Sequence, residues 1–187
     1  PGHNLDAVLI ALDALIDPAG MGMSARRITL STVAPKGTLP RLAQWGRPIK
    51  LALSLHAPED ALRHELIPGV RLRGVRDTLD EADDLFGKTG REYTVEYVLL
   101  HEVNDSKEQA GALAALLSGR RLHVNLIPYN SVAGLEFKRP PIERQKTFAD
   151  LLRESGLPVT LRRSLGGAED AACGQLRRRP APTTPGA

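Results

Sequence analysis

The chain has 187 residues, of which 42% are hydrophobic and 25% are charged, a composition that excludes a disordered or membrane-embedded protein. Its formal net charge is +3, it has one cysteine, and no apolar run reaches the roughly 18 residues of a spanning helix. One cysteine excludes an internal disulfide framework and a metal or iron–sulfur site made only of thiolates from this chain. We therefore expect a cytoplasmic protein with no membrane partner.

The first third of the chain alternates between helical and strand periodicity. Apolar residues recur at helical spacing over residues 5–16, with Asn4 as a predicted N-cap. A β-rich run follows, then a short helix, a second strand and a helix that ends before Pro68. In chain order these elements span residues 5–16 (helix), 27–33 (strand), 39–45 (helix), 49–56 (strand) and 60–66 (helix).

The alternation continues to the end of the globular part. Ser106 and Gln109 form a capping-box pattern ahead of an apolar helix, and Pro128 ends the strand that follows it. Pro141 suits the first turn of the next helix. These elements span residues 75–87 (helix), 93–100 (strand), 110–117 (helix), 122–128 (strand), 141–155 (helix) and 159–163 (strand).

Strands that alternate with helices predict an α/β fold with a parallel sheet, either open or curled into a barrel. In a barrel, right-handed crossovers would put the helices outside, with the functional site at the carboxyl ends of the strands.

The predicted strands have one apolar face and one face of small or polar residues. In the strand of residues 49–56, Leu51, Leu53 and Leu55 point to one side, and Ser54 and His56 to the other. The strands of residues 27–33, 93–100 and 122–128 alternate in the same way, and Glu96 lies on the polar face. We expect helices to bury the apolar face and the polar face to line a ligand cavity. An open sheet with one solvated face is the alternative, which the covering helices of parallel sheets disfavour.

Cys173 lies among small residues, which would leave its thiol accessible, but a lone cysteine is usually inert and by itself makes only a weak nucleophile candidate. Residues 177–187 hold three arginines and no acid, and we expect a disordered Arg/Pro-rich tail there. The chain begins with Pro1 and enters a helix almost at once, so we expect that an N-terminal part is missing.

Six segments, taken in order, resemble the RlmN/Cfr family of radical S-adenosylmethionine (SAM) RNA methyltransferases. The resemblance extends over residues 1–176, and it implies the C-terminal part of a partial six-stranded β/α barrel. The segments are residues 27–33 (RITLSTV), 51–58 (LALSLHAP), 96–100 (EYVLL), 103–105 (VND), 124–130 (VNLIPYN) and 170–176 (DAACGQL).

The resemblance also implies site residues and cofactors. The cysteine that accepts a methyl group from SAM matches Cys173, whose thiolate would be a strong nucleophile towards a sulfonium-bound methyl. A second SAM would be cleaved at a [4Fe–4S] cluster, whose three cysteine ligands and the resolving cysteine match no residue of this chain. The positions that contact SAM match Ser31, Ser54, Leu55, His56 and Asn130.

The implied activity is methylation of C2 of an adenine in 23S rRNA, and by extension in tRNA, with RNA and an electron donor for the cluster as partners. Methylation at C8, as in the resistance relatives, is the near alternative. A non-catalytic SAM- or nucleotide-binding module is the alternative from a different class. We expect the complete protein to be a monomer and this chain to be inactive by itself.

Overall fold

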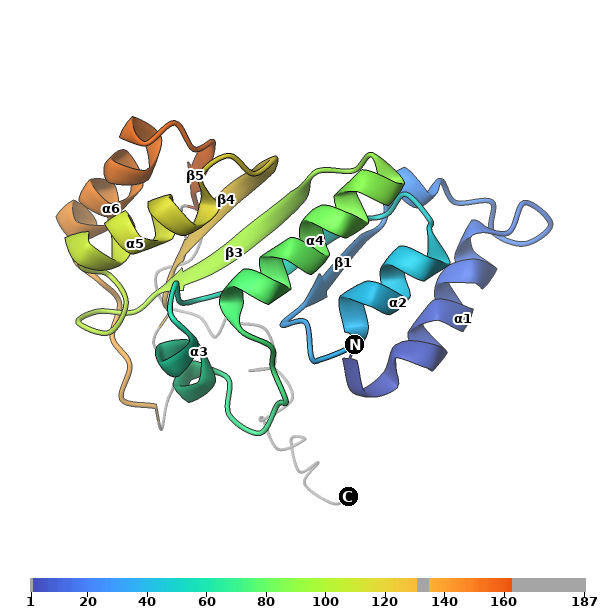
Figure 1. Ribbon diagram of the computed structural model, residues 1–187, viewed down its shortest axis with the longest axis horizontal. Coiled ribbons are helices and arrows are strands. Elements are labelled where there is room, and N and C mark those ends of the chain that lie inside the picture. Colours follow the sequence, from blue (N-terminus) through green and yellow to red (C-terminus); the bar gives the residue numbers. More distant parts are fainter. Residues whose placement is uncertain (1, 131–134, 163–187) are drawn as a thin grey trace, which may run out of the picture.

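The computed structural model describes residues 2–130 and 135–162, and its centre is one five-stranded sheet (Figure 1). All neighbouring strands are parallel, and their order in the sheet, β1-β2-β3-β4-β5, follows the chain. The predicted α/β fold with a parallel sheet is confirmed. The strands are β1 (Thr29–Thr32), β2 (Lys50–Ser54), β3 (Tyr93–Leu99), β4 (Leu122–Pro128) and β5 (Val159–Leu161).

Helices connect each strand to the next. Because every crossover in such a sheet is right-handed and moves in one direction, the crossover helices collect on one face, as Figure 1 shows. Among the described helices, none is long and apolar enough to cross a membrane. The helices are α1 (Leu5–Ile16), α2 (Thr38–Trp45), α3 (Asp60–Leu66), α4 (Val75–Thr89), α5 (Lys107–Leu117) and α6 (Ile142–Glu154), with short 3₁₀ turns at Gly2–Asn4 and Ala25–Arg27.

Both predicted N-cap residues lie at the starts of their helices, but only Ser106 makes a capping hydrogen bond. Ser106 caps α5, and its hydroxyl accepts the Gln109 backbone N–H at 3.2 Å. Asn4 occupies the predicted N-cap position of α1, but its side chain makes no capping hydrogen bond. β1 and β2 are also shorter than predicted, because a 3₁₀ turn precedes Thr29 and His56 leaves the strand conformation.

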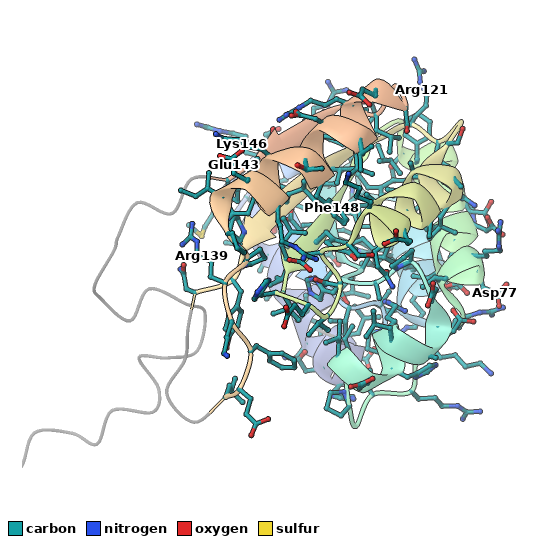
Figure 2. All side chains as sticks on the ribbon, turned by 90° about the vertical axis from the view of Figure 1, so that its left-hand side faces the viewer. Asp77, Arg121, Arg139, Glu143, Lys146 and Phe148 are labelled. Atoms are coloured by element: carbon teal, nitrogen blue, oxygen red, sulfur yellow. The ribbon has the colours of Figure 1, made fainter. Side chains whose placement is uncertain are left out.

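The apolar face of the sheet and the inner faces of the helices form one core. Leu53, Val95 and Leu126 are completely buried, as the alternation of apolar and polar residues predicts. Phe148 of α6, which is labelled in Figure 2, packs against Tyr97 of β3 with ring centroids 5.5 Å apart. The helices thus cover the apolar face of the sheet and do not cover its polar face.

Arg63 of α3 is a buried arginine at the carboxyl edge of the sheet, with 1% of its surface exposed. Its Nη2 donates to the Val33 carbonyl after β1 (2.7 Å), and its Nε to the Leu55 carbonyl after β2 (3.2 Å). Nη1 reaches the Arg73 carbonyl at 3.4 Å. Burial lowers the pKa of Arg63 to about 10, against the charge of Asp60, so the guanidinium stays charged at neutral pH. This one side chain ties together the ends of two strands.

Asn104 does the same for β2 and β3, and it is fully buried. Its Nδ2 donates to the carbonyls of His56 (2.8 Å) and Val98 (2.7 Å), while its Oδ1 accepts the Leu100 N–H (2.7 Å). Its own carbonyl accepts the Tyr97 hydroxyl at 3.0 Å. Asn104 therefore satisfies backbone groups that would otherwise be buried without partners where the strands end.

We predict that Arg63→Met destabilises the fold by about 2–4 kcal/mol, because the Val33 and Leu55 carbonyls lose their donors and each such loss costs about 1–3 kcal/mol. The free energy of unfolding from urea titrations measures the effect. Arg76→Met, at an exposed position on α4, is the matched control and should change stability little. Equal effects of the two substitutions would contradict the role given to Arg63.

Candidate functional site

The polar face of the sheet carries two rows of side chains across the strands. Strand pairing places Ser54 opposite Glu96, Glu96 opposite Asn125, and Asn125 opposite Thr160. A second row, nearer the amino ends of the strands, joins Ser31, Ala52, Thr94 and His123. The predicted polar face thus exists, and most of its side chains can form hydrogen bonds.

Two hydrogen-bonded pairs occupy this face. The Asn125 amide donates to both carboxylate oxygens of Glu96, at 3.1 and 3.4 Å. His123 Nε2 lies 2.8 Å from the Thr160 hydroxyl. The alternation of residues placed Glu96 on this face, but the sequence did not indicate its partner, because strand register decides which residue lies opposite. Glu96 keeps acceptor capacity for a ligand donor.

A hollow of about 410 Å³ opens at the amino end of the same face. Lys50, Thr94 and His123 line it from the strands, and Arg91 and Arg121 from the loops before β3 and β4. Phe86, Glu92 and Tyr93 also line it, and the Glu92 carboxylate lies 4.0 Å from Arg121 Nε. Basic side chains thus outnumber acidic ones in the hollow, whereas the row that contains Glu96 and Asn125 is neutral and acidic.

His56 has an unusual backbone conformation just beyond β2, with φ at +64°. Its Nδ1 accepts the Val98 backbone N–H at 3.1 Å, beyond the last residue pair between β2 and β3. Burial, and secondly the charge of Arg63, lower the pKa of His56 to about 4. The ring is therefore neutral at physiological pH with its proton on Nε2, which can donate to a ligand.

The other predicted SAM-contacting residues differ in their surroundings. Ser31 is exposed and Ser54 is half-buried, and both lie on the polar face. Leu55 points into the core and is fully buried, its N–H donates to the Glu96 carbonyl, and its carbonyl accepts from Arg63. Its side chain therefore faces away from the polar face.

Asn130 follows β4 at the carboxyl edge, and its Oδ1 accepts a hydrogen bond from Arg139 Nη1 at 3.1 Å. Ser54, His56 and Asn130 all lie where their strands end, which is where parallel sheets bind ligands. Cys173, the predicted methyl acceptor, lies outside the described residues.

The loop after β3 contains a buried carboxylate that sequence analysis did not single out as a functional group. The side chain of Asp105 is 1% exposed, and its Oδ1 accepts from Arg144 Nη2 (2.8 Å) and the Glu102 N–H (2.9 Å). Its Oδ2 lies 3.3 Å from His101 Nδ1. This network attaches the loop to the first turn of α6 and so fixes one wall of the carboxyl edge.

Within the described ranges, no three His, Cys, Asp or Glu side chains are grouped so as to hold a metal ion. The whole chain has one cysteine, so it cannot supply the three thiolates that a [4Fe–4S] cluster of the implied type needs. The hydroxyl, amide and imidazole groups of the polar face do suit a ligand with ribose hydroxyls and an amino-acid moiety, as SAM has.

The chain is similar in sequence to curated RNA methyltransferases. The chain is 47% identical over 180 residues to a probable dual-specificity RNA methyltransferase RlmN from Symbiobacterium thermophilum, and 48% identical over 183 residues to one from Synechococcus elongatus. These alignments cover 96% and 95% of this chain, but 48% and 50% of the relatives. The chain thus spans about half the length of the curated relatives it matches.

A solved structure is similar over the same extent. The crystal structure of a radical SAM methyltransferase from Sphaerobacter thermophilus superposes with a TM-score of 0.84 at 42% identity, covering 94% of this chain and 51% of that one. A scan against protein-family models finds no match.

We predict that His56 makes stability depend on pH. The unfolded chain binds a proton at this residue below about pH 6.5, whereas the native state does so only below about pH 4. The free energy of unfolding should therefore fall as the pH drops through this window, by up to about 3 kcal/mol.

Urea titrations between pH 4.5 and 7.5 measure this dependence. His56→Gln should flatten it, whereas His64→Gln, at an exposed position on α3, is the matched control and should leave it in place. A pH dependence that survives in His56→Gln would show that other groups cause it.

Proposed function

The chain belongs to the RlmN family, and from this premise we propose that it is part of a radical SAM methyltransferase that methylates C2 of an adenine in 23S rRNA and tRNA. It spans about half the length of the family members it matches. One observation carries the proposal above all. The residues that match SAM-contacting positions of the family, apart from Leu55, lie on the polar face or at the carboxyl edge of the sheet.

We assign SAM binding to this face. Ser31 and Ser54 would contact the ligand from adjacent strands, and the Nε2–H of His56 would donate to an oxygen or nitrogen acceptor. Because the His56 ring is held by the Val98 amide and stays neutral, it adds no positive charge next to the sulfonium of SAM. A neutral histidine here therefore suits a cationic ligand better than a protonated one would.

Cys173 is the proposed methyl acceptor. A bond would form between its sulfur and the methyl carbon of SAM while the bond from that carbon to the sulfonium breaks, which releases S-adenosylhomocysteine. The thiolate is the reactive form, so the thiol proton must leave before the transfer.

The family resemblance implies a [4Fe–4S] cluster, which supplies one-electron chemistry in radical SAM enzymes. The residues of this chain do not fit such a cluster. The chain has a single cysteine, and it is already assigned to methyl transfer. We therefore assign no reaction step of the cluster to residues 1–187.

The proposal is tested in cells by nucleoside mass spectrometry of rRNA and tRNA. Deleting the gene that encodes this chain should abolish 2-methyladenosine, and complementation with the unaltered gene should restore it. Cys173→Ala should restore none, because the methyl acceptor is lost, and Ser54→Val should restore about tenfold less because one ligand hydrogen bond is removed.

Thr29→Val, at an exposed hydroxyl at the amino end of β1, is the matched control for Ser54→Val and should restore methylation fully. A loss of 8-methyladenosine in place of 2-methyladenosine would favour the C8 alternative. If neither nucleoside depends on the gene, the proposed activity is wrong.

A further inference from the structure

The segment that follows β4 exposes apolar side chains at the carboxyl edge. Of the six large apolar side chains that are exposed in residues 2–130 and 135–162, three lie within eight residues of each other: Leu135 (49% exposed), Phe137 (38%) and Ile142 (65%). Single exposed apolar residues are common on proteins, but a cluster beside a candidate site indicates a contact surface. We call residues 135–139 together with Tyr129 the edge strip.

Hydrogen bonds hold the edge strip against the rest of the fold. The Lys138 carbonyl accepts the His101 N–H at 2.9 Å, and Arg139 donates to Asn130 at 3.1 Å. The Gln145 amide donates to the Pro140 carbonyl at 2.6 Å. Because the segment is already ordered, a partner that binds its apolar surface loses less conformational entropy than one that must order a loop.

The aromatic rings of the edge strip are also arranged in a fixed geometry. Tyr129 and Phe137 meet edge to face, with ring centroids 6.1 Å apart and an interplanar angle of 78°. The Tyr129 backbone N–H donates to the Leu99 carbonyl at the end of β3, which ties this pair to the sheet. Tyr129 is half-buried and supports the exposed ring of Phe137, and Asn130 is the next residue along the chain after Tyr129.

The charges of the edge strip favour an anionic partner. Lys138 and Arg139 are exposed beside Phe137, and Glu136 is the one acid among residues 135–139. Figure 2 shows Arg139 on the outer side of the loop that leads into α6, with Glu143 and Lys146 on the helix beyond it. Aromatic rings combined with basic side chains are the features by which proteins bind unpaired nucleotides.

We propose that the edge strip binds the RNA substrate, with an unpaired base stacked on Phe137 and the neighbouring phosphates on Lys138 and Arg139. This inference rests on the proposed function, and it deepens it by naming residues that recognise the RNA. An adenine that is to be methylated must leave its stack to reach the carboxyl edge of the sheet. A base stacked on Phe137 would hold the adjoining nucleotide open beside Asn130.

The test measures binding of two fluorescently labelled RNA hairpins to the full chain by fluorescence anisotropy. One hairpin carries unpaired adenines in its loop, and the other has abasic sites at the same positions. Phe137→Ala should weaken binding of the first hairpin about tenfold and leave the second unchanged, and Phe137→Trp should restore the affinity. Lys138→Ala should weaken both equally and lower the salt dependence of binding, because it removes a phosphate contact.

Two controls separate the edge strip from unspecific binding. Ile10→Ala removes a side chain that is 71% exposed on α1, and Lys50→Ala removes a cation from the hollow at the amino end of the sheet. Neither should change the preference between the two hairpins. Circular dichroism melting of every variant confirms that the fold is intact.

If Phe137→Ala leaves the preference for unpaired bases unchanged, or if the unaltered chain binds neither hairpin, the inference is wrong. The methylation measurement in cells does not depend on this result. It therefore still decides the proposed function when the edge strip has no part in RNA binding.

Discussion

The backbone groups at the carboxyl ends of the strands need hydrogen-bond partners inside the protein, and the rest of the structure depends on how this need is met. Arg63 supplies donors to the ends of β1 and β2, and Asn104 supplies donors and an acceptor to the ends of β2 and β3. Both residues come from the segments that follow strands, so the sheet and its βα loops fix each other. The candidate site lies where these two residues hold three strands in register.

The conformation of His56 follows from this arrangement. Its carbonyl bonds to Asn104 and its ring nitrogen accepts an amide of β3, so a residue with a positive φ is held from both sides. Strained backbone is common at functional positions, where the surrounding structure determines it. Burial and the charge of Arg63 keep the ring neutral, and the contact with the Val98 amide leaves the other ring nitrogen to carry the N–H, which suits a cationic ligand.

The two faces of the sheet, and its two ends, carry different kinds of side chains. Helices bury the apolar face, and that burial supplies the stability of the fold. The polar face carries the Glu96–Asn125 pair and, at its amino end, a hollow with more basic than acidic side chains, while the edge strip adds aromatic and basic side chains at the carboxyl end. A ligand on the polar face and a polyanion at the carboxyl edge would therefore meet beside Asn130.

Much of the fold could be predicted from the sequence, because helix and strand periodicity are local properties. The alternation in residues 51–56 and 93–97 indicated which side chains would be buried, and the capping of α5 by Ser106 was readable from two residues three positions apart. The family resemblance indicated the candidate site residues for the same reason, since it rests on short segments in a fixed order. The ends of β1 and β2 were less predictable, because the turns that shorten them depend on contacts with other elements.

The tertiary structure alone decided the pairings that give the site its chemistry. Arg63 appears in the sequence as one charged residue of a short helix, and only the fold places it 2.7 Å from a carbonyl 30 residues away. The bond between Asn125 and Glu96 depends on the register of β3 and β4, which no local pattern encodes. The lowered pKa of His56 likewise comes from burial and from Arg63, so it arises only once distant segments have packed together. Periodicity needs only neighbours in the chain, whereas these contacts need neighbours in space.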